Sequence, residues 1–298
     1  MFATVYLHPD RTIAARWRMD DVPVLLDLAF ADQVHLETAQ SLPDAISLIL
    51  ADVTSVRLAI PMSATLMHRY PIEADESVTE RRAFEIATCL PGLDHDNDFV
   101  LDQPFSWEMS GVRWHALHVV PREVCETVRR ISTGHPVDVI QLSAAAEIRA
   151  AAMATFVRGN TLLVGRRADR WEILAAEQQG PLGHMIIRSD DPDVPARDIV
   201  RDIVVDIIGA SGRQIDQCCV YGDDLDLATF ESIQQALSDV VPNVARLVPF
   251  RAVRAEVADS VRSTCLRLAH VIAPVVGLCQ PIPNDLVLHD VCVSPADI

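Results

Sequence analysis

The sequence predicts an α/β protein of two similar lobes, each built on a mixed sheet flanked by helices. The chain has 298 residues, which is long for one hydrophobic core and sufficient for two. Residues 156–164 have the pattern of a strand, a tight glycine turn and a second strand, and residues 5–13 carry a weaker version of it. Strand and helix patterns alternate after both hairpins, which indicates one α/β unit in each half of the chain.

The first half is predicted to begin with a three-strand meander. Its strands are residues 2–7, 11–17 and 22–30. A helix at residues 37–50, interrupted near Pro43, follows the meander. Two compact apolar segments then predict strands at residues 56–61 and 66–72.

A capped helix and a strand pair come next. Ser77-Val78-Thr79-Glu80 is a capping box, so we expect a helix to begin there. Its buried face is expected to contain Val78, Phe84, Ala87 and Leu90. Residues 99–108 and 112–120 have the pattern of paired strands joined across Met109-Ser110-Gly111.

The first half is predicted to end with two helices and a short strand. Pro121 suits the start of a helix because its φ is fixed near the helical value. That helix should bury Val124, Val128 and Ile131. A strand at residues 136–142 and an alanine-rich helix at residues 143–152 complete the half.

The second half is predicted to repeat the meander. Residues 153–157 and 161–165 form its opening hairpin, and residues 171–178 form the third strand. The later elements alternate between helix and strand, at residues 195–208, 215–221, 225–237, 246–248 and 256–271.

The charge and the basic residues exclude several functions. The formal net charge is −17, which argues against nucleic acid and against anionic membrane surfaces as partners. All 25 basic residues are arginine. The absence of lysine excludes a P-loop lysine and a Schiff-base lysine.

The cysteines and the apolar segments favour a cytoplasmic protein. There are seven cysteines, an odd number, and no Cys-x-x-Cys pair, as is typical of a reducing compartment. We find no secretory signal at the N-terminus. The longest apolar run, residues 271–279, is far too short to span a membrane.

Four residue clusters resemble metal-binding or anion-binding sites, but a structural explanation is favoured for each. Asp94-x-Asp96-x-Asp98 lacks the glycine of a calcium loop, so we expect a solvated turn and no metal site. His115 and His118 would face opposite sides of a strand, as would Cys218 and Cys219, so neither pair should share a ligand. Three arginines lie at the turn after residues 161–165, namely Arg166, Arg167 and Arg170. They could hold an anion or an acidic segment of a partner, but a solvated surface is the favoured explanation.

The order of elements resembles the actin–hexokinase–chaperone ATPase superfamily. It is most similar to the pilus and secretion branch, PilM of type IV pili and the cytoplasmic domain of GspL of type II secretion. Four stretches carry the resemblance, namely the N-terminal hairpin, residues 56–72 with the capped helix, residues 156–180, and Gln217–Gly222 with the apolar segment ending at Gly277-Leu278. The resemblance implies a duplicated actin-like, ribonuclease H-like fold. Its lobes would be residues 1–150, with an inserted subdomain at about 56–133, and residues 151–298.

Proteins of this superfamily bind ATP and magnesium with two Asp-x-Gly hairpins and a Gly-Gly turn. In this chain Leu7-His8-Pro9-Asp10 stands at the first turn, where proline offers no N–H to a phosphate. Val157-Arg158-Gly159 stands at the predicted second turn, with valine in place of the aspartate that orders the metal. Gly222-Asp223 replaces the Gly-Gly pair, which brings a carboxylate toward the phosphates.

The resemblance and these replacements predict a pseudo-ATPase scaffold with no catalytic residue, no metal and no cofactor. It would recruit a membrane-anchored assembly protein or a motor ATPase at the inner face of the inner membrane, without inserting into the membrane itself. The fold is compatible with an oligomer. Two alternatives remain open: an ATPase or kinase of the same fold that binds ATP and magnesium through atypical phosphate loops, and a filament-forming cytoskeletal relative.

Overall fold

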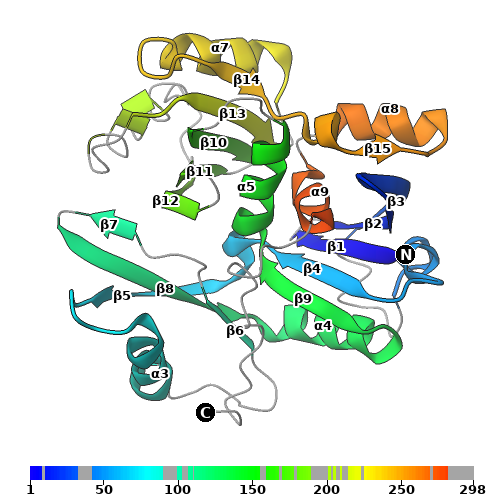
Figure 1. Cartoon of the computed structure of the whole chain (residues 1–298), viewed down its shortest axis with the longest axis horizontal. Helices are drawn as coiled ribbons and strands as arrows, with labels where there is room; N and C mark the ends of the chain where they lie inside the picture. The colour runs from blue at the N-terminus through cyan, green and yellow to red at the C-terminus, as the bar shows by residue number, and fades with distance from the viewer. Residues whose placement is uncertain are drawn as a thin grey trace.

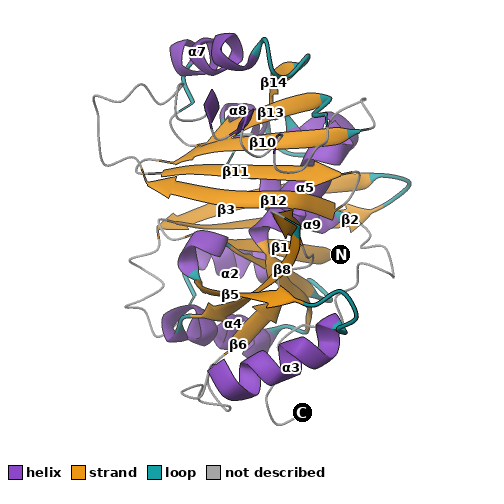
Figure 2. Cartoon of the chain, turned by 90° about the vertical axis from the view of Figure 1, so that its left-hand side faces the viewer, coloured by secondary structure: helices purple, strands orange, loops and turns teal. Residues whose placement is uncertain are grey.

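The computed structural model describes most of the chain. The described residues are 1–8, 11–32, 42–89, 99–102, 107–109, 111–154, 159–167, 170–177, 180–188, 201–202, 204–205, 209, 214–222, 225–268 and 271–280. Two larger sheets lie one above the other, and a smaller third sheet lies at one end (Figure 1, Figure 2).

The two larger sheets have the same strand order and the same strand directions. The first sheet consists of β1 (Phe2–His8), β2 (Arg11–Met19), β3 (Pro23–Asp32), β4 (Val56–Ile60) and β9 (Val137–Leu142), with β15 (Arg254–Ala255) added beside β3. The second consists of β10 (Asn160–Arg167), β11 (Arg170–Glu177), β12 (Gly180–Arg188), β13 (Gln217–Gly222) and β14 (Val244–Arg246).

In both sheets the first three strands form an antiparallel meander, and the fourth strand runs parallel to the first. A fifth strand runs parallel to the fourth in each sheet. The prediction of a repeated mixed α/β unit is therefore confirmed.

Helices cover both faces of the first sheet. Along β1, Ala3, Val5 and Leu7 pack in one core cluster, whereas Phe2 and Tyr6 belong to another, because successive side chains of a strand point to opposite faces. The first cluster includes side chains of α2 (Asp44–Leu50) and α4 (Arg122–Gly134). The second includes side chains of α8 (Asp259–Arg267) and α9 (Ala273–Cys279).

Two helices at the centre join the halves of the molecule. α5 (Ser143–Ala154) and α9 lie side by side between the two larger sheets (Figure 1). Gly277 allows this close packing, because a Cβ there would overlap the carbonyl oxygen of Ala146. The core cluster on α5 extends to Leu163 and Leu174 of the second sheet.

The chain returns to the first sheet after β14. η2 (Pro249–Ala252) leads to β15, which pairs with β3, and α8 and α9 then pack on the same sheet. The predicted division at residue 150 did not anticipate this return. The helix predicted at residues 256–271 is present as the shorter α8, which ends at Arg267. α9, which begins at Ala273 with Pro274 in its first turn, was not predicted.

The third sheet belongs to a segment inserted between β4 and α4, which we call the insert (residues 61–120). It contains η1 (Met62–Ala64), β5 (Leu66–Ile72), α3 (Val78–Cys89), β6 (Phe99–Asp102), β7 (Trp107–Met109) and β8 (Val112–Val120). β8 pairs antiparallel with β5 on one side and with β6 and β7 on the other. The predicted subdomain of about 56–133 also took in β4, which pairs with β1 in the first sheet.

The buried face of α3 differs from the predicted one. Phe84 is 54% exposed, whereas Arg82, Glu85 and Ile86 are buried. The apolar periodicity misled here because the helix buries charged side chains that have ion-pair or hydrogen-bond partners. By contrast, the predicted buried residues of α4, Val124, Val128 and Ile131, are confirmed.

One further helix lies beside the second sheet. α7 (Leu227–Leu237) joins β13 to β14, and the Asp226 side chain caps it by accepting a hydrogen bond from the Thr229 N–H. Most of the predicted helix at residues 195–208 lies outside the described residues. Within the described part of the chain, no helix is long and apolar enough to cross a membrane.

Candidate functional site

The first predicted nucleotide turn joins β1 to β2. The last pair of this hairpin is His8 with Arg11, so Pro9 and Asp10 form the connection. Pro9 and Asp10 themselves lie outside the described residues. The hairpin is thus confirmed, and the consequence of its missing glycine stays a prediction.

The second hairpin is not where the sequence pattern placed it. Residues 153–154 belong to α5, and β10 pairs with β11 up to Arg167 and Arg170. The turn that corresponds to the β1–β2 turn is therefore Ala168-Asp169, which lies outside the described residues, as does Val157. This turn also lacks glycine, so the Asp-x-Gly pattern is absent from the corrected position as well.

Gly159 has a packing role just before β10. The Asp216 carboxylate accepts a 2.8 Å hydrogen bond from the Asn160 N–H, and the Asp216 N–H donates to the Asn160 carbonyl at 2.9 Å. A Cβ on Gly159 would overlap that carboxylate. The glycine is explained by the close approach of Asp216, and the hairpin interpretation of Gly159 was wrong.

The third predicted turn begins at Gly222, the last residue of β13. Gly222 has φ +130°, a conformation that side chains with a Cβ rarely adopt. It pairs with Arg166, so this turn lies beside the end of β10. Asp223 lies outside the described residues. The structure thus brings the second and third turns to the carboxyl ends of adjacent parallel strands, where α/β proteins commonly bind ligands.

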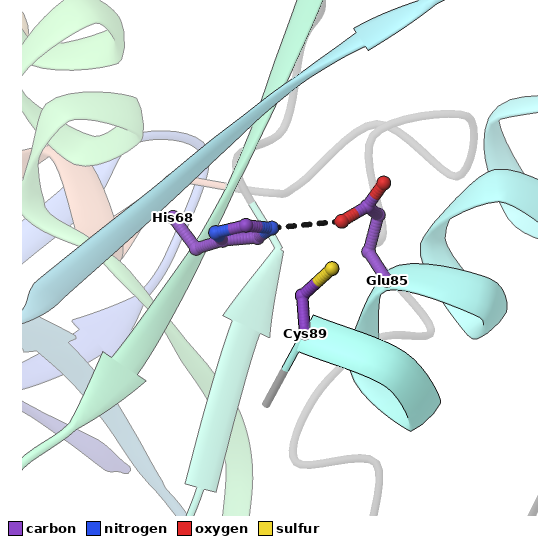
Figure 3. Close-up of side chains that lie close together, drawn as sticks. All are labelled: His68, Glu85 and Cys89. Atoms are coloured by element: carbon purple, nitrogen blue, oxygen red, sulfur yellow. Dashed lines mark hydrogen bonds and ion pairs between the residues drawn. The ribbon is translucent and has the colours of Figure 1, made fainter. Parts of the chain in front are cut away.

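A different cluster, absent from the sequence-based predictions, lies on the insert. His68 of β5 and Glu85 and Cys89 of α3 point toward one another (Figure 3). The His68 Nε2 lies 2.8 Å from the Glu85 Oε2, and the Arg81 Nη2 lies 2.5 Å from the Glu85 Oε1. The ligand atoms of His68, Glu85 and Cys89 all lie within 4.8 Å of one another. The i, i+4 spacing of Glu85 and Cys89 is visible in the sequence, but only the packing of α3 on β5 brings His68 to them.

The charge on Glu85 is stabilised by its neighbours. Burial by itself raises the pKa of this carboxyl group. Hydrogen bonds with Cys89, His68 and Arg81 outweigh that effect, so the pKa lies below its ordinary value. Glu85 is therefore expected to be ionised at neutral pH and to offer an anionic oxygen to a ligand.

The paired histidines and cysteines lie as predicted. His115 contacts the ring of Tyr70, while the His118 Nδ1 lies 2.7 Å from the Thr65 Oγ1. Cys218 and Cys219 pack in different core clusters, on opposite faces of β13. The acidic residues Asp94, Asp96 and Asp98 lie outside the described residues.

Two arginines hold the C-terminal end of α9. The Arg57 Nη1 donates to the carbonyls of Leu278 and Gln280 at 2.9 Å each, and the Arg149 Nε donates to that of Gly277 at 3.1 Å. These cations face the negative end of the helix dipole. Burial, followed by the charge of Arg57, lowers the pKa of Arg149 to about 10. We assign this pair a structural role.

The comparisons with known proteins identify the fold. No protein-family model matches the chain, and no curated protein matches it by sequence. Among solved structures it is similar to the PilM–PilN type IV pilus biogenesis complex, with a TM-score of 0.61 and 12% identity over 94% of this chain and 98% of the other.

Two further solved structures resemble the chain over most of its length. A Bacteroides thetaiotaomicron protein with an actin-like ATPase fold has a TM-score of 0.52 and 10% identity, over 84% of this chain and 94% of that one. The cytoplasmic domain of EpsL from the Vibrio cholerae type II secretion system has a TM-score of 0.45 and 11% identity, over 80% and 94%. The two repeated sheets, the insert and the first two of these likenesses show that this chain has the actin-like ATPase fold.

Proposed function

We propose that this protein is a non-catalytic actin-like scaffold of a pilus-like or type II secretion-like machine at the inner membrane. Its role would be to recruit a membrane-anchored partner or a motor ATPase. The observation that carries the proposal is the likeness to PilM of the PilM–PilN complex, which covers 94% of this chain and 98% of that one. That likeness extends through the insert as well as the two repeated sheets.

The nucleotide turns support the non-catalytic part of the proposal. The first turn offers Pro9 and Asp10 in place of Asp-x-Gly, so one backbone N–H is lost. The corrected second turn, Ala168-Asp169, has no glycine. The third has Asp223 after Gly222, which brings a negative charge toward the phosphates.

The surface of the insert supports the recruiting part of the proposal. Large apolar side chains are exposed there, namely Leu66 (71%), Met67 (39%), Phe84 (54%) and Val112 (39%). Within the described residues β5 ends its sheet and pairs only with β8, so its other edge can accept a strand from a partner. Leu66 and Met67 lie on β5 itself, and exposed apolar side chains on an open edge strand are typical of an interaction surface.

The partner segment should be basic. The net charge of −17 attracts a cationic segment and speeds its encounter with the protein, and it repels acidic ones. A short lysine- or arginine-rich segment would match the net charge of the protein.

Co-purification of the chain with the membrane-anchored proteins encoded beside it tests the proposal. We expect one of them to bind, and we expect Leu66→Asp to weaken binding about tenfold or more, because a charge would then enter an apolar contact. Leu48→Asp is the matched control, since Leu48 is 68% exposed on α2, outside the insert. The proposal fails if no such protein binds, and the assigned surface is wrong if the two variants bind equally well.

One feature bears on the alternative, a nucleotide-binding enzyme of the same fold. Arg166, Arg167 and Arg170 flank the corrected second turn, where a phosphate would lie. They can attract an anion without ordering a magnesium ion. Saturable binding of Mg-ATP in a titration would favour this alternative.

A further inference from the structure

The cluster of His68, Glu85 and Cys89 combines three metal-ligating groups of different chemistry. Within the described residues it is the one group of three histidine, cysteine or acidic side chains whose ligand atoms all lie within 4.8 Å of one another. In a tetrahedral zinc site, ligand atoms lie about 3.3–3.7 Å apart, given bond lengths of about 2.0–2.3 Å. Small side-chain rotations would bring these three groups to that spacing.

The packing of α3 on β5 sets up this arrangement. Glu85 and Cys89 are four residues apart, so they lie on the same face of α3. His68 and Tyr70 are two residues apart on β5, so their side chains lie on the same face of the sheet. On that face Tyr70 packs in a core cluster with Ile86 of α3. The contact that forms the core of the insert therefore also aims His68 at the last two turns of the helix.

We propose that His68 Nε2, Glu85 Oε2 and Cys89 Sγ bind a zinc ion, with water as the fourth ligand. Imidazole and thiolate favour zinc over magnesium or calcium, which prefer oxygen ligands. Three protein ligands with one open position form a recognised type of zinc coordination. The ion would bind as the Cys89 thiol loses its proton to solvent.

The neighbours of the cluster suit this ion. Arg81 contacts the Oε1 of Glu85, which leaves Oε2 to face His68. A zinc ion would replace the hydrogen bond between His68 and Glu85, while Arg81 would hold the carboxylate from behind, as outer partners of metal ligands do. Cys89 is exposed and the His68 side chain is 30% exposed, so an ion can enter from solvent.

The ion would fasten α3 to the sheet of the insert. The core between them is small and contains Tyr70, Ile72, Ile86, Val100 and Leu117. A metal that binds the folded form stabilises it in proportion to the logarithm of the metal concentration. The Cys89 thiol also hydrogen-bonds Glu85, so a network without metal includes it as well, and the dependence of Cys89 alkylation on added zinc distinguishes the two explanations.

Alkylation of Cys89 is the direct test. We would use the full chain without a polyhistidine tag, in a Cys292→Ser background, since Cys292 lies outside the described residues and the other five cysteines are buried. Zinc at ten times its dissociation constant should slow the alkylation of Cys89 about elevenfold, because the protection equals one plus the ratio of free zinc to that constant. Alkylation at an unchanged rate in saturating zinc would overturn the proposal.

Ligand variants supply the second readout. Cobalt should give a thiolate-to-metal charge-transfer band that Cys89→Ser abolishes, and this exposed substitution should leave the fold intact. His68→Gln should weaken zinc binding at least about tenfold, whereas His135→Gln, a partly exposed histidine after α4, should leave it unchanged. Equal zinc affinity in the wild type, Cys89→Ser and His68→Gln would overturn the proposal.

Discussion

Gly159 and Cys89 illustrate what the sequence could predict at the scale of single residues. Gly159 was predicted to form the tight turn of a hairpin, but it lies just before β10, where the Asp216 carboxylate approaches it closely. A glycine before a strand and a glycine in a hairpin turn look alike in the sequence. Cys89 offered no signal, because its neighbour His68 is 21 positions away along the chain.

Cys279 should make the protein less stable in alkali. Burial raises the pKa of its thiol from 9.0 to about 12. The folded form therefore holds this proton more tightly, and the resulting stability is fully present below pH 9 and is lost as the pH rises toward 12. Over this range the free energy of unfolding of the wild type should fall as the pH rises. In Cys279→Ala the fall should be smaller, by up to about 1.4 kcal/mol per pH unit.

Urea unfolding of both proteins at pH 8 and pH 10.5 would measure the effect. Cys89→Ala is the matched control for the loss of a thiol at an exposed position. The same slope in the wild type and in Cys279→Ala would contradict the assigned pKa.

At the scale of elements, most strands and helices were predictable from local patterns, and the errors have physical causes. β10 and β11 were predicted, at residues 161–165 and 171–178, but as the second and third strands of the meander, because Gly159 was interpreted as the turn of the first hairpin. β12 was missed because Gly180, Pro181 and Gly183 are residues that usually interrupt a strand. The buried face of α3 was wrong because Glu85 is buried through partners distant in sequence. α9 lies beyond the helix predicted at residues 256–271 and was not predicted, although Pro274 marks its first turn.

The packing of α9 on α5 should depend on Gly277. Gly277→Ala would drive a methyl group into the Ala146 carbonyl, and backbone cannot move aside as a side chain can. We expect the free energy of unfolding to fall by about 1–3 kcal/mol or more. Gly134→Ala at the end of α4 is the matched control, since a Cβ there meets no atom within 4 Å. Equal thermal stability of the two variants would rule out the close contact between α5 and α9.

At the scale of the whole molecule, the repeat was predictable while the way the halves interlock was not. The order of strand and helix patterns predicted two similar lobes, and both larger sheets have the same strand order. The return of the chain to the first sheet through β15, α8 and α9 rests on contacts between residues more than 200 positions apart, such as Arg57 with Leu278. No local pattern predicts such a contact.

The molecule keeps the fold of the actin-like ATPases, but its nucleotide turns differ from theirs. The actin-like fold is retained, whereas all three turns that would bind ATP and magnesium depart from the family pattern, with Pro9, Ala168-Asp169 and Asp223 as the decisive replacements. Pro9 removes a backbone donor, Ala168-Asp169 lacks the glycine of the family turn, and Asp223 adds a negative charge near the phosphates. Together they predict that these turns do not hold a nucleotide.

Calorimetric titration of the full chain with ATP and magnesium tests this central claim most directly. The account predicts no saturable heat at micromolar protein, and the same result with ADP. Restoring glycines at the first turn, as in Pro9→Gly, should not by itself create binding, because the other two turns remain altered. Saturable binding of Mg-ATP with a dissociation constant in the micromolar range would contradict the account and favour the nucleotide-dependent alternative.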